Sequence, residues 1–322
     1  MLVHLARRVA AAAPALGVAL VLLFCFLQVV PGDPFSREPA SGLSRDTGAV
    51  RRALGADRPP DERFLSWAAG LATGDMGRSW SLRRPVAEAI GEAAGNTVLL
   101  MAAAIAAQFA LGIGAGALAA GVRGGRLDRV LGGGFTVAYS LPSYWTGLIL
   151  MVVFSVRLGW LPVSQMHSPG SDDLPALWRL WDAALHMALP VVSLALPGAA
   201  GIALLVREEI GDALTGRFAL AARARGASRR RTVALHALRG ALRPVAGLLG
   251  LALPGLAGGS VVVESLFAWP GMGRLAYQAA LARDEPLILG CAAATALLVV
   301  AGGLAADLAV AVLDPRVREG DG

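Results

Sequence analysis

The sequence predicts an all-α protein that crosses a membrane several times, and three observations support this. Only 16% of the 322 residues are charged, whereas soluble globular domains carry about a quarter. The mean hydropathy is +0.60, and 56% of the residues are hydrophobic. Several apolar runs reach the roughly 18–20 residues that a helix needs to cross a bilayer. We therefore expect six transmembrane helices, with a small extramembrane segment between the first two.

The first apolar run, from about Val9 to Val30, predicts the first helix. It is too long for the apolar core of a signal peptide, and no small-residue cleavage site follows it, so we expect it to be retained. The polar segment at 32–95 contains nine arginines and nine acidic residues. Its Leu65-Ser66-Trp67 and GDMGRSWS (74–81) stretches favour a small folded element. A disordered linker rich in Gly and Pro is the alternative.

Five further apolar runs complete the predicted membrane core. The expected spans are Thr97–Gly121, Gly133–Val156 with an interruption at Pro142, His186–Val206 with Pro190 and Pro197 inside it, Pro244–Val263, and Pro286–Leu313. Trp residues in the loop at 157–185 suit a membrane interface. Gly112 with Gly116, and Gly255 with Gly259, have the spacing of closely packed helix faces. A glycine-rich composition alone also produces such pairs.

Arginine placement predicts the orientation, because the chain contains no lysine and its 29 basic residues are all arginine. In the short loops and tails, sixteen arginines lie on the side of the two termini and four on the opposite side. Cytoplasmic loops are enriched in basic residues, so we expect both termini and the 207–243 loop in the cytoplasm. The lack of lysine also excludes P-loop, Schiff-base and kinase-type chemistry.

Other chemistry has little support in the sequence. Cys25 and Cys291 lie inside apolar runs and are expected to be buried free thiols. No catalytic or metal-binding motif is present. Asp307 is the only acid well inside a predicted span. Ion-coupled secondary transporters usually carry several buried ionisable groups, so this class remains the weaker alternative.

The basic loop contains the strongest pattern, FALAARARGASRRR at 218–231. If this stretch is helical, small residues line two adjacent faces: Ala219, Ala222 and Gly226 on one, and Ala221, Ala224 and Ser228 on the other. Gly226 suits the end of one helix and Ser228 the N-cap of the next. We expect the second helix to run toward Gly240 and to break before Pro244.

Three functions fit such a loop: an ordinary basic loop at the membrane, nucleic-acid binding, or docking of a partner protein. Nucleic-acid binding is disfavoured, because neither interleaved aromatic residues nor a known binding module is present. The small faces favour docking, since they let another protein approach the backbone closely. The arginines can meet acidic groups on that partner or lipid phosphates.

The loop resembles the EAA motif of permease subunits in ATP-binding-cassette importers. That pattern reads E-A-A, three residues, G, nine residues, and I-x-L-P. Leu220-Ala221-Ala222 precede Gly226 by this spacing, and His236-Ala237-Leu238-Arg239 stand at the I-x-L-P positions. Leu220 replaces the acid, His236 the isoleucine and Arg239 the proline.

These departures resemble the peptide/nickel branch of the family, with A-R-A-[KR]-G followed by H-A-L-R-N. Ala222-Arg223-Ala224-Arg225-Gly226 match its first part, and Gly240 stands where that branch often has asparagine. Further stretches similar to this branch cover nearly the whole chain: PGDP (31–34), GDMGRSWSLRRPV (74–86), SLPSYWTGLILMVVFSVRLGWLPVS (140–164), VVVESLFAWPGMGRL (261–275) and LDPRVR (313–318).

The resemblance implies a type I importer permease in a bacterial plasma (inner) membrane, forming half of a translocation pathway. Its parts would be 1–31 with the first helix, an extracytoplasmic segment at 32–95, a permease core at 96–313 that includes the 207–243 loop, and a cytoplasmic tail at 314–322. Expected partners are two ATPase subunits, a second homologous permease and an extracytoplasmic binding protein. The chain itself is expected to be non-catalytic and to bind no cofactor, while ATP and Mg²⁺ are used by the ATPases.

The resemblance also implies two sets of site residues. Those expected to couple to the ATPase are Leu220, Ala221, Ala222, Arg223, Ala224, Arg225, Gly226, Ser228, His236, Leu238 and Arg239. Those expected at the pore or its outer mouth are Ser140, Ser143, Tyr144, Glu264, Trp269, Gly271 and Gly273. We expect a peptide cargo, because the spans hold no His, Cys or Met cluster suited to a soft metal. Nickel or another small solute is the alternative.

Overall fold

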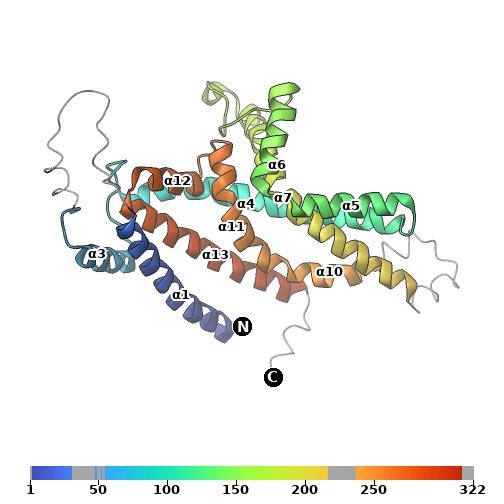
Figure 1. Cartoon of the computed structure of the whole chain (residues 1–322), viewed down its shortest axis with the longest axis horizontal. Helices are drawn as coiled ribbons and strands as arrows, with labels where there is room; N and C mark the ends of the chain where they lie inside the picture. The colour runs from blue at the N-terminus through green and yellow to red at the C-terminus, as the bar shows by residue number, and fades with distance from the viewer. Residues whose placement is uncertain (1, 31–47, 49–51, 53–54, 217–236, 314–322) are drawn as a thin grey trace. The chain divides into compact units, whose positions relative to one another are not determined.

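A computed structural model of the chain describes residues 2–30, 48, 52, 55–216 and 237–313. Every regular element in these ranges is helical, as the sequence predicts (Figure 1). The helices are α1 (Leu2–Val29), α3 (Pro60–Thr73), α4 (Val86–Gly121), α5 (Arg126–Ser140), α6 (Ser143–Leu150), the π-helix Met151–Arg157, a 3₁₀ turn at Ser171–Asp173, α7 (Ala176–Thr215), α10 (Leu238–Gly247), α11 (Leu249–Leu266), α12 (Met272–Ala282) and α13 (Glu285–Leu313).

The chain divides into two compact units. Unit 1 comprises Met1–Thr97 with Pro270–Ala301, and unit 2 comprises Val98–Trp269 with Gly302–Gly322. In unit 1, Trp67 of α3 packs with residues of α1 and α13, so the predicted folded element is present. Both cysteines are free, but the prediction that both are buried is wrong for Cys25, which lies on an exposed side of α1.

Three helices are long and apolar enough to cross a membrane. Among the described residues these are Val86–Gly121, Ala176–Thr215 and Glu285–Leu308, and the number rises to five if each of two bent pairs is one span. The bent pairs combine α5 with α6 and its π-helix, and α10 with α11. The apolar part of α1, Ala13–Val29, is shorter.

The glycine pair on α4 packs against α7, as the sequence predicts. A Cβ placed on Gly112 would lie 2.7 Å from the carbonyl oxygen of Ala199. A Cβ on Gly116 would lie 2.6 Å from the carbonyl oxygen of Ala203. Close approach of this kind is a main source of helix association in lipid. For the second pair only Gly259 is near another helix, because a Cβ on Gly255 would meet nothing within 4 Å.

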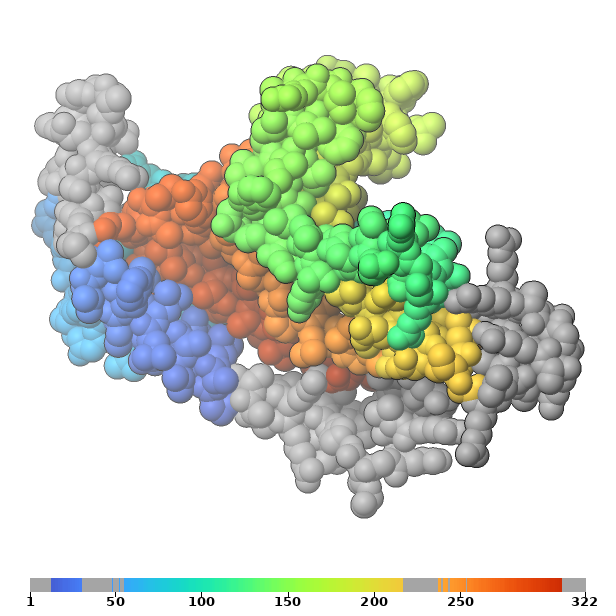
Figure 2. Space-filling view, turned by 45° about the vertical axis from the view of Figure 1, so that its right-hand side comes forward, coloured from blue at the N-terminus to red at the C-terminus, as the bar shows by residue number. Residues whose placement is uncertain are grey.

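The predicted interruption at Pro142 is a sharp corner. The helices on its two sides, Arg126–Ser140 and Ser143–Arg157, meet at 107°. Figure 2 shows them in two shades of green, running in different directions across the face in view. A proline disfavours helical backbone at the residue before it, and Leu141 is extended with ψ 131°. One straight span over 133–156 is therefore not formed.

Three helix limits differ from the expected ones. The second span begins at Val86, so the end of the polar segment at 32–95 is already helical. The fourth helix continues past Val206 to Thr215 and has 40 residues, about 60 Å at 1.5 Å per residue. The predicted break before Pro244 is wrong, because Pro244 lies inside α10. Ala241 and Val245 are buried there, and their packing holds the helix across the proline.

Candidate coupling loop and pathway site

The predicted coupling residues fall mostly outside the described part of the chain. Residues 217–236 hold Leu220 through Ser228 and His236, so their helices and turn stay predictions. The described residues on either side belong to α7, which ends at Thr215, and α10, which begins at Leu238. Of the predicted set, the structure therefore describes Leu238 and the backbone of Arg239.

The two flanks of the loop pack against each other. Ile210 and Leu214 on α7 share an apolar cluster with Ala237, Ala241 and Val245. All five side chains are at least nine-tenths buried, and the half-buried Leu238 packs against the same cluster. The end of α7 and the start of α10, which flank the basic loop in the sequence, thus form a packed helical stem.

Of the three predicted pore residues near Pro142, two are exposed and one faces a neighbouring helix. Ser140 and Tyr144 are exposed, and the hydroxyl of Ser140 donates a hydrogen bond to the carbonyl oxygen of Thr136 at 2.9 Å. Ser143 faces α11, because a Cβ on Gly259 would lie 3.3 Å from its Oγ. Exposed polar side chains therefore lie on both sides of the corner.

Glu264 and Trp269 are both fully buried within unit 2. Glu264 lies in the last turn of α11, as expected, and its carbonyl oxygen accepts a hydrogen bond from the backbone N–H of Trp269 at 2.8 Å. Ala268 between them has φ 50°, a strained value for a residue with a Cβ. Neither side chain can touch a solute in this conformation.

The connection between α11 and α12 is short. Gly271 is the N-cap of α12, and Gly273 lies inside the helix. The backbone N–H of Met272 donates to Oγ1 of Thr97 at 2.8 Å, and Nδ2 of Asn96 donates to the carbonyl oxygen of Pro270 at 2.9 Å. Two side chains of α4 therefore fix the start of α12.

Asp284 is a structural centre that the sequence analysis missed. It is fully buried, and its Oδ2 accepts hydrogen bonds from Oγ of Ser79 at 2.5 Å, N–H of Ser81 at 2.8 Å and Oγ of Ser81 at 2.7 Å. Its Oδ1 accepts from the N–H of Leu287 at 3.2 Å, which caps α13. An Asp directly before Glu285-Pro286 is a typical helix start, so a signal for this role was present.

Replacing Asp284 by asparagine is expected to loosen the 74–81 turn. The amide NH₂ group cannot accept the hydrogen bonds that Ser79 and Ser81 donate to the carboxylate. A lost buried hydrogen bond of this kind costs about 1–3 kcal/mol. The measurement is the melting temperature of the purified chain, together with protease cleavage within 74–85. Glu88→Gln is the matched control, since that acid is 57% exposed. Equal melting temperatures for both variants would contradict the assigned role.

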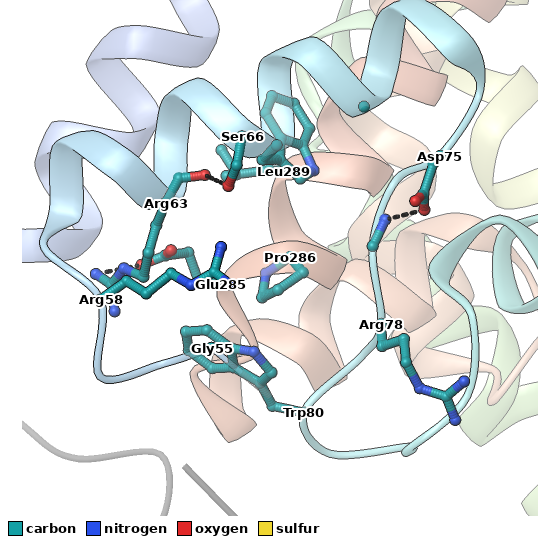
Figure 3. Close-up of a pocket in the computed structure, with 13 residues that line it drawn as sticks. Gly55, Arg58, Arg63, Ser66, Asp75, Arg78, Trp80, Glu285, Pro286 and Leu289 are labelled. Carbon is teal, nitrogen blue, oxygen red and sulfur yellow. Dashed lines mark hydrogen bonds and ion pairs between the residues drawn. The ribbon is translucent and has the colours of Figure 1, made fainter. Parts of the chain in front are cut away.

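A cavity of about 250 Å³ in unit 1 is lined by residues of α3, the 74–81 turn and the start of α13 (Figure 3). Glu285 on its wall forms an ion pair with Arg63 at 3.1 Å and accepts a hydrogen bond from Nε2 of Gln28 at 2.8 Å. Arg63 also donates to Oε1 of Gln28 at 2.7 Å. This polar network connects α1, α3 and α13, while Arg78 points away from it in Figure 3.

Long apolar helices, close glycine packing and a proline corner define a helical membrane protein with several spans. The sequence comparisons place it more narrowly. Residues 112–319 match the family described as "Binding-protein-dependent transport system inner membrane component". The chain belongs to this family, and it is thus a permease component of a transport system rather than an enzyme.

Two relatives match over nearly their full length. The oligopeptide transport system permease protein AppB of Bacillus subtilis is 33% identical over 320 residues, covering 99% of this chain and 100% of AppB. The glutathione transport system permease protein GsiC of Pectobacterium atrosepticum is 34% identical over 324 residues, covering 99% of each chain. The predicted resemblance to importer permeases is therefore confirmed.

Proposed function

We propose that this chain forms half of the translocation pathway of an ATP-driven peptide importer. The observation that carries the proposal is the end-to-end similarity to an oligopeptide and a glutathione permease. The resemblance of the basic loop to the EAA motif agrees with this proposal. Nickel or another small solute is the alternative cargo within the same family.

The proposed topology has six spans: α1, α4, the α5–α6 pair, α7, the α10–α11 pair and α13. The arginine bias supports cytoplasmic termini and a cytoplasmic 207–243 loop. Residues 1–31, 32–95, 96–313 and 314–322 would then be the N-terminal helix, the extracytoplasmic segment, the permease core and the cytoplasmic tail. The exposed Trp160, Trp178 and Trp181 agree with an interface position for the 157–185 loop.

We propose that the 217–236 segment seats in a separate ATPase, one of two, and that ATP and Mg²⁺ bind there. A second, homologous permease would complete the pathway, and an extracytoplasmic binding protein would deliver the solute. The packed stem beneath the loop supports this role, since a lever has to be held firmly at its base. Movement of the ATPases on ATP binding would then move α7 and α10.

The segment at 261–275 is proposed as an outer-mouth element that closes the pathway or seats the binding protein. Glu264→Ala and Trp269→Ala are each expected to lower solute uptake, because both side chains are fully buried and hold the end of α11. Uptake is measured in vesicles and normalised to the amount of assembled complex. Normal uptake by both variants would contradict the proposed outer-mouth role of the segment.

The cargo is tested by purifying the binding protein of the same system and identifying its ligand by mass spectrometry. The reconstituted complex is then supplied with that ligand and ATP. A bound peptide and ATP-dependent peptide uptake are expected. Nickel bound to the binding protein would make nickel, not peptide, the proposed cargo. Transport by this chain alone, without ATPases, would favour a secondary transporter.

A further inference from the structure

A shielded ion pair joins the first turn of α5 to α7 within unit 2. Nε of Arg207 lies 2.7 Å from Oδ1 of Asp128, and the two side chains are 17% and 9% exposed. The other carboxylate oxygen of Asp128 accepts a hydrogen bond from the N–H of Gly124 at 3.0 Å. Arg207 also lies against Gly132, where an added Cβ would be 3.6 Å from the guanidinium carbon. The charge pair and its backbone partner are therefore closely fitted.

A second contact lies one turn further along α7. Nη1 of Arg123 is 3.3 Å from Oδ1 of Asp212 and 3.4 Å from the carbonyl oxygen of Glu208. A Cβ on Gly211 would collide with the same nitrogen, so Arg123 lies directly over a glycine. Asp212 is 81% exposed. Solvent screens this outer pair, and it is expected to contribute far less than the shielded one.

The last turns of α7 thus have two packed faces. Arg207 and Gly211 face the α4–α5 turn, while Ile210 and Leu214 pack in the cluster shared with α10. The 217–236 segment begins directly after these turns. A displacement of the end of α7 would therefore act on α5 through the ion pair, and α5 leads to the corner at Pro142.

We infer that Asp128 and Arg207 are positioning residues that transmit the movement of the 217–236 segment to α5. This inference rests on the proposed coupling role of that segment. Removing one member of a shielded pair leaves the other charge uncompensated, so the start of α5 would no longer follow α7. The expected defect is a loss of transport per ATP hydrolysed, rather than a loss of the complex.

The test uses the reconstituted complex with its ATPases, partner permease and binding protein, supplied with the ligand identified on that binding protein. Asp128→Asn keeps the shape of the side chain and removes its charge. Solute transported per ATP should fall by about tenfold, while ATP hydrolysis stays within about twofold of the original rate. Asp212→Asn is the matched control and should retain the original ratio. Asp128→Asn combined with Arg207→Gln should be no worse than either change alone.

Gly226→Leu in the same vesicles separates the possible failures. If Gly226→Leu uncouples transport but Asp128→Asn keeps the original amount of solute transported per ATP, only this inference is overturned. Unchanged coupling in both variants overturns the proposed role of the loop as well. If solute uptake, ATP hydrolysis and melting temperature all fall together in Asp128→Asn, the ion pair only stabilises the fold. That result would also overturn the inference.

Discussion

Gly116→Leu is expected to disrupt the packing of α4 against α7 and to destabilise the folded permease strongly. A Cβ at this position would meet the carbonyl oxygen of Ala203 at 2.6 Å and the Cβ of Val206 at 2.8 Å. Neither atom can rotate away, because one is backbone and the other is fixed to it. The helices would have to separate, at a cost of about 1–3 kcal/mol or more. Separation would also open the cluster that supports the loop stem.

The measurement is the melting temperature and the monodisperse yield of the detergent-solubilised chain. Gly114→Leu is the matched control on the same helix, since a Cβ there meets nothing within 4 Å. The control should behave as the original chain, and Gly116→Ala should be intermediate. A stable Gly116→Leu protein would show that α4 and α7 do not approach as described.

Gly226→Leu is expected to uncouple ATP hydrolysis from transport in the assembled importer. The proposal places Gly226 at the end of a short helix, where a left-handed conformation costs a residue with a Cβ roughly 1–2 kcal/mol. A leucine side chain would also keep the ATPase groove away from the small faces of the segment. Both effects act on docking, so solute uptake should fall by at least tenfold, about 1.4 kcal/mol of coupling.

Hydrolysis stimulated by the binding protein and solute uptake are measured together in vesicles. Gly226→Ala should show a weaker defect than Gly226→Leu, because it introduces the same backbone strain but adds only one methyl group. Co-purification of the ATPases reports whether docking itself is lost. Unchanged stimulation and uptake in Gly226→Leu would contradict the docking role of the loop.

Local sequence rules predicted the helical class, the three long apolar helices and the packing of Gly112 and Gly116. They also predicted the break at Pro142, since the residue before a proline avoids helical backbone. They failed at Pro244 because Ala241 and Val245 are buried on both sides of it, and tertiary packing outweighs one missing hydrogen bond. Helix limits at Val86 and Thr215 were missed because polar residues can continue a helix beyond the bilayer.

The polar centres were hidden because their partners are far apart in the sequence. Asp284 binds Ser79 and Ser81 more than 200 residues away, and Arg207 binds Asp128 from another helix. The spacing of apolar residues within one segment does not predict such long-range pairs. The signal that existed was local: an Asp before a Glu-Pro helix start, and an Arg in the first residues after a predicted span.

The length of α7 has a mechanical consequence. A helix of 40 residues measures about 60 Å, twice the roughly 30 Å of the hydrocarbon layer. If such a rod tilts as one body by about 10°, one end sweeps about 10 Å relative to the other. A small rotation near the membrane would therefore give a large stroke at the tip, and a small force at the tip would turn the whole rod.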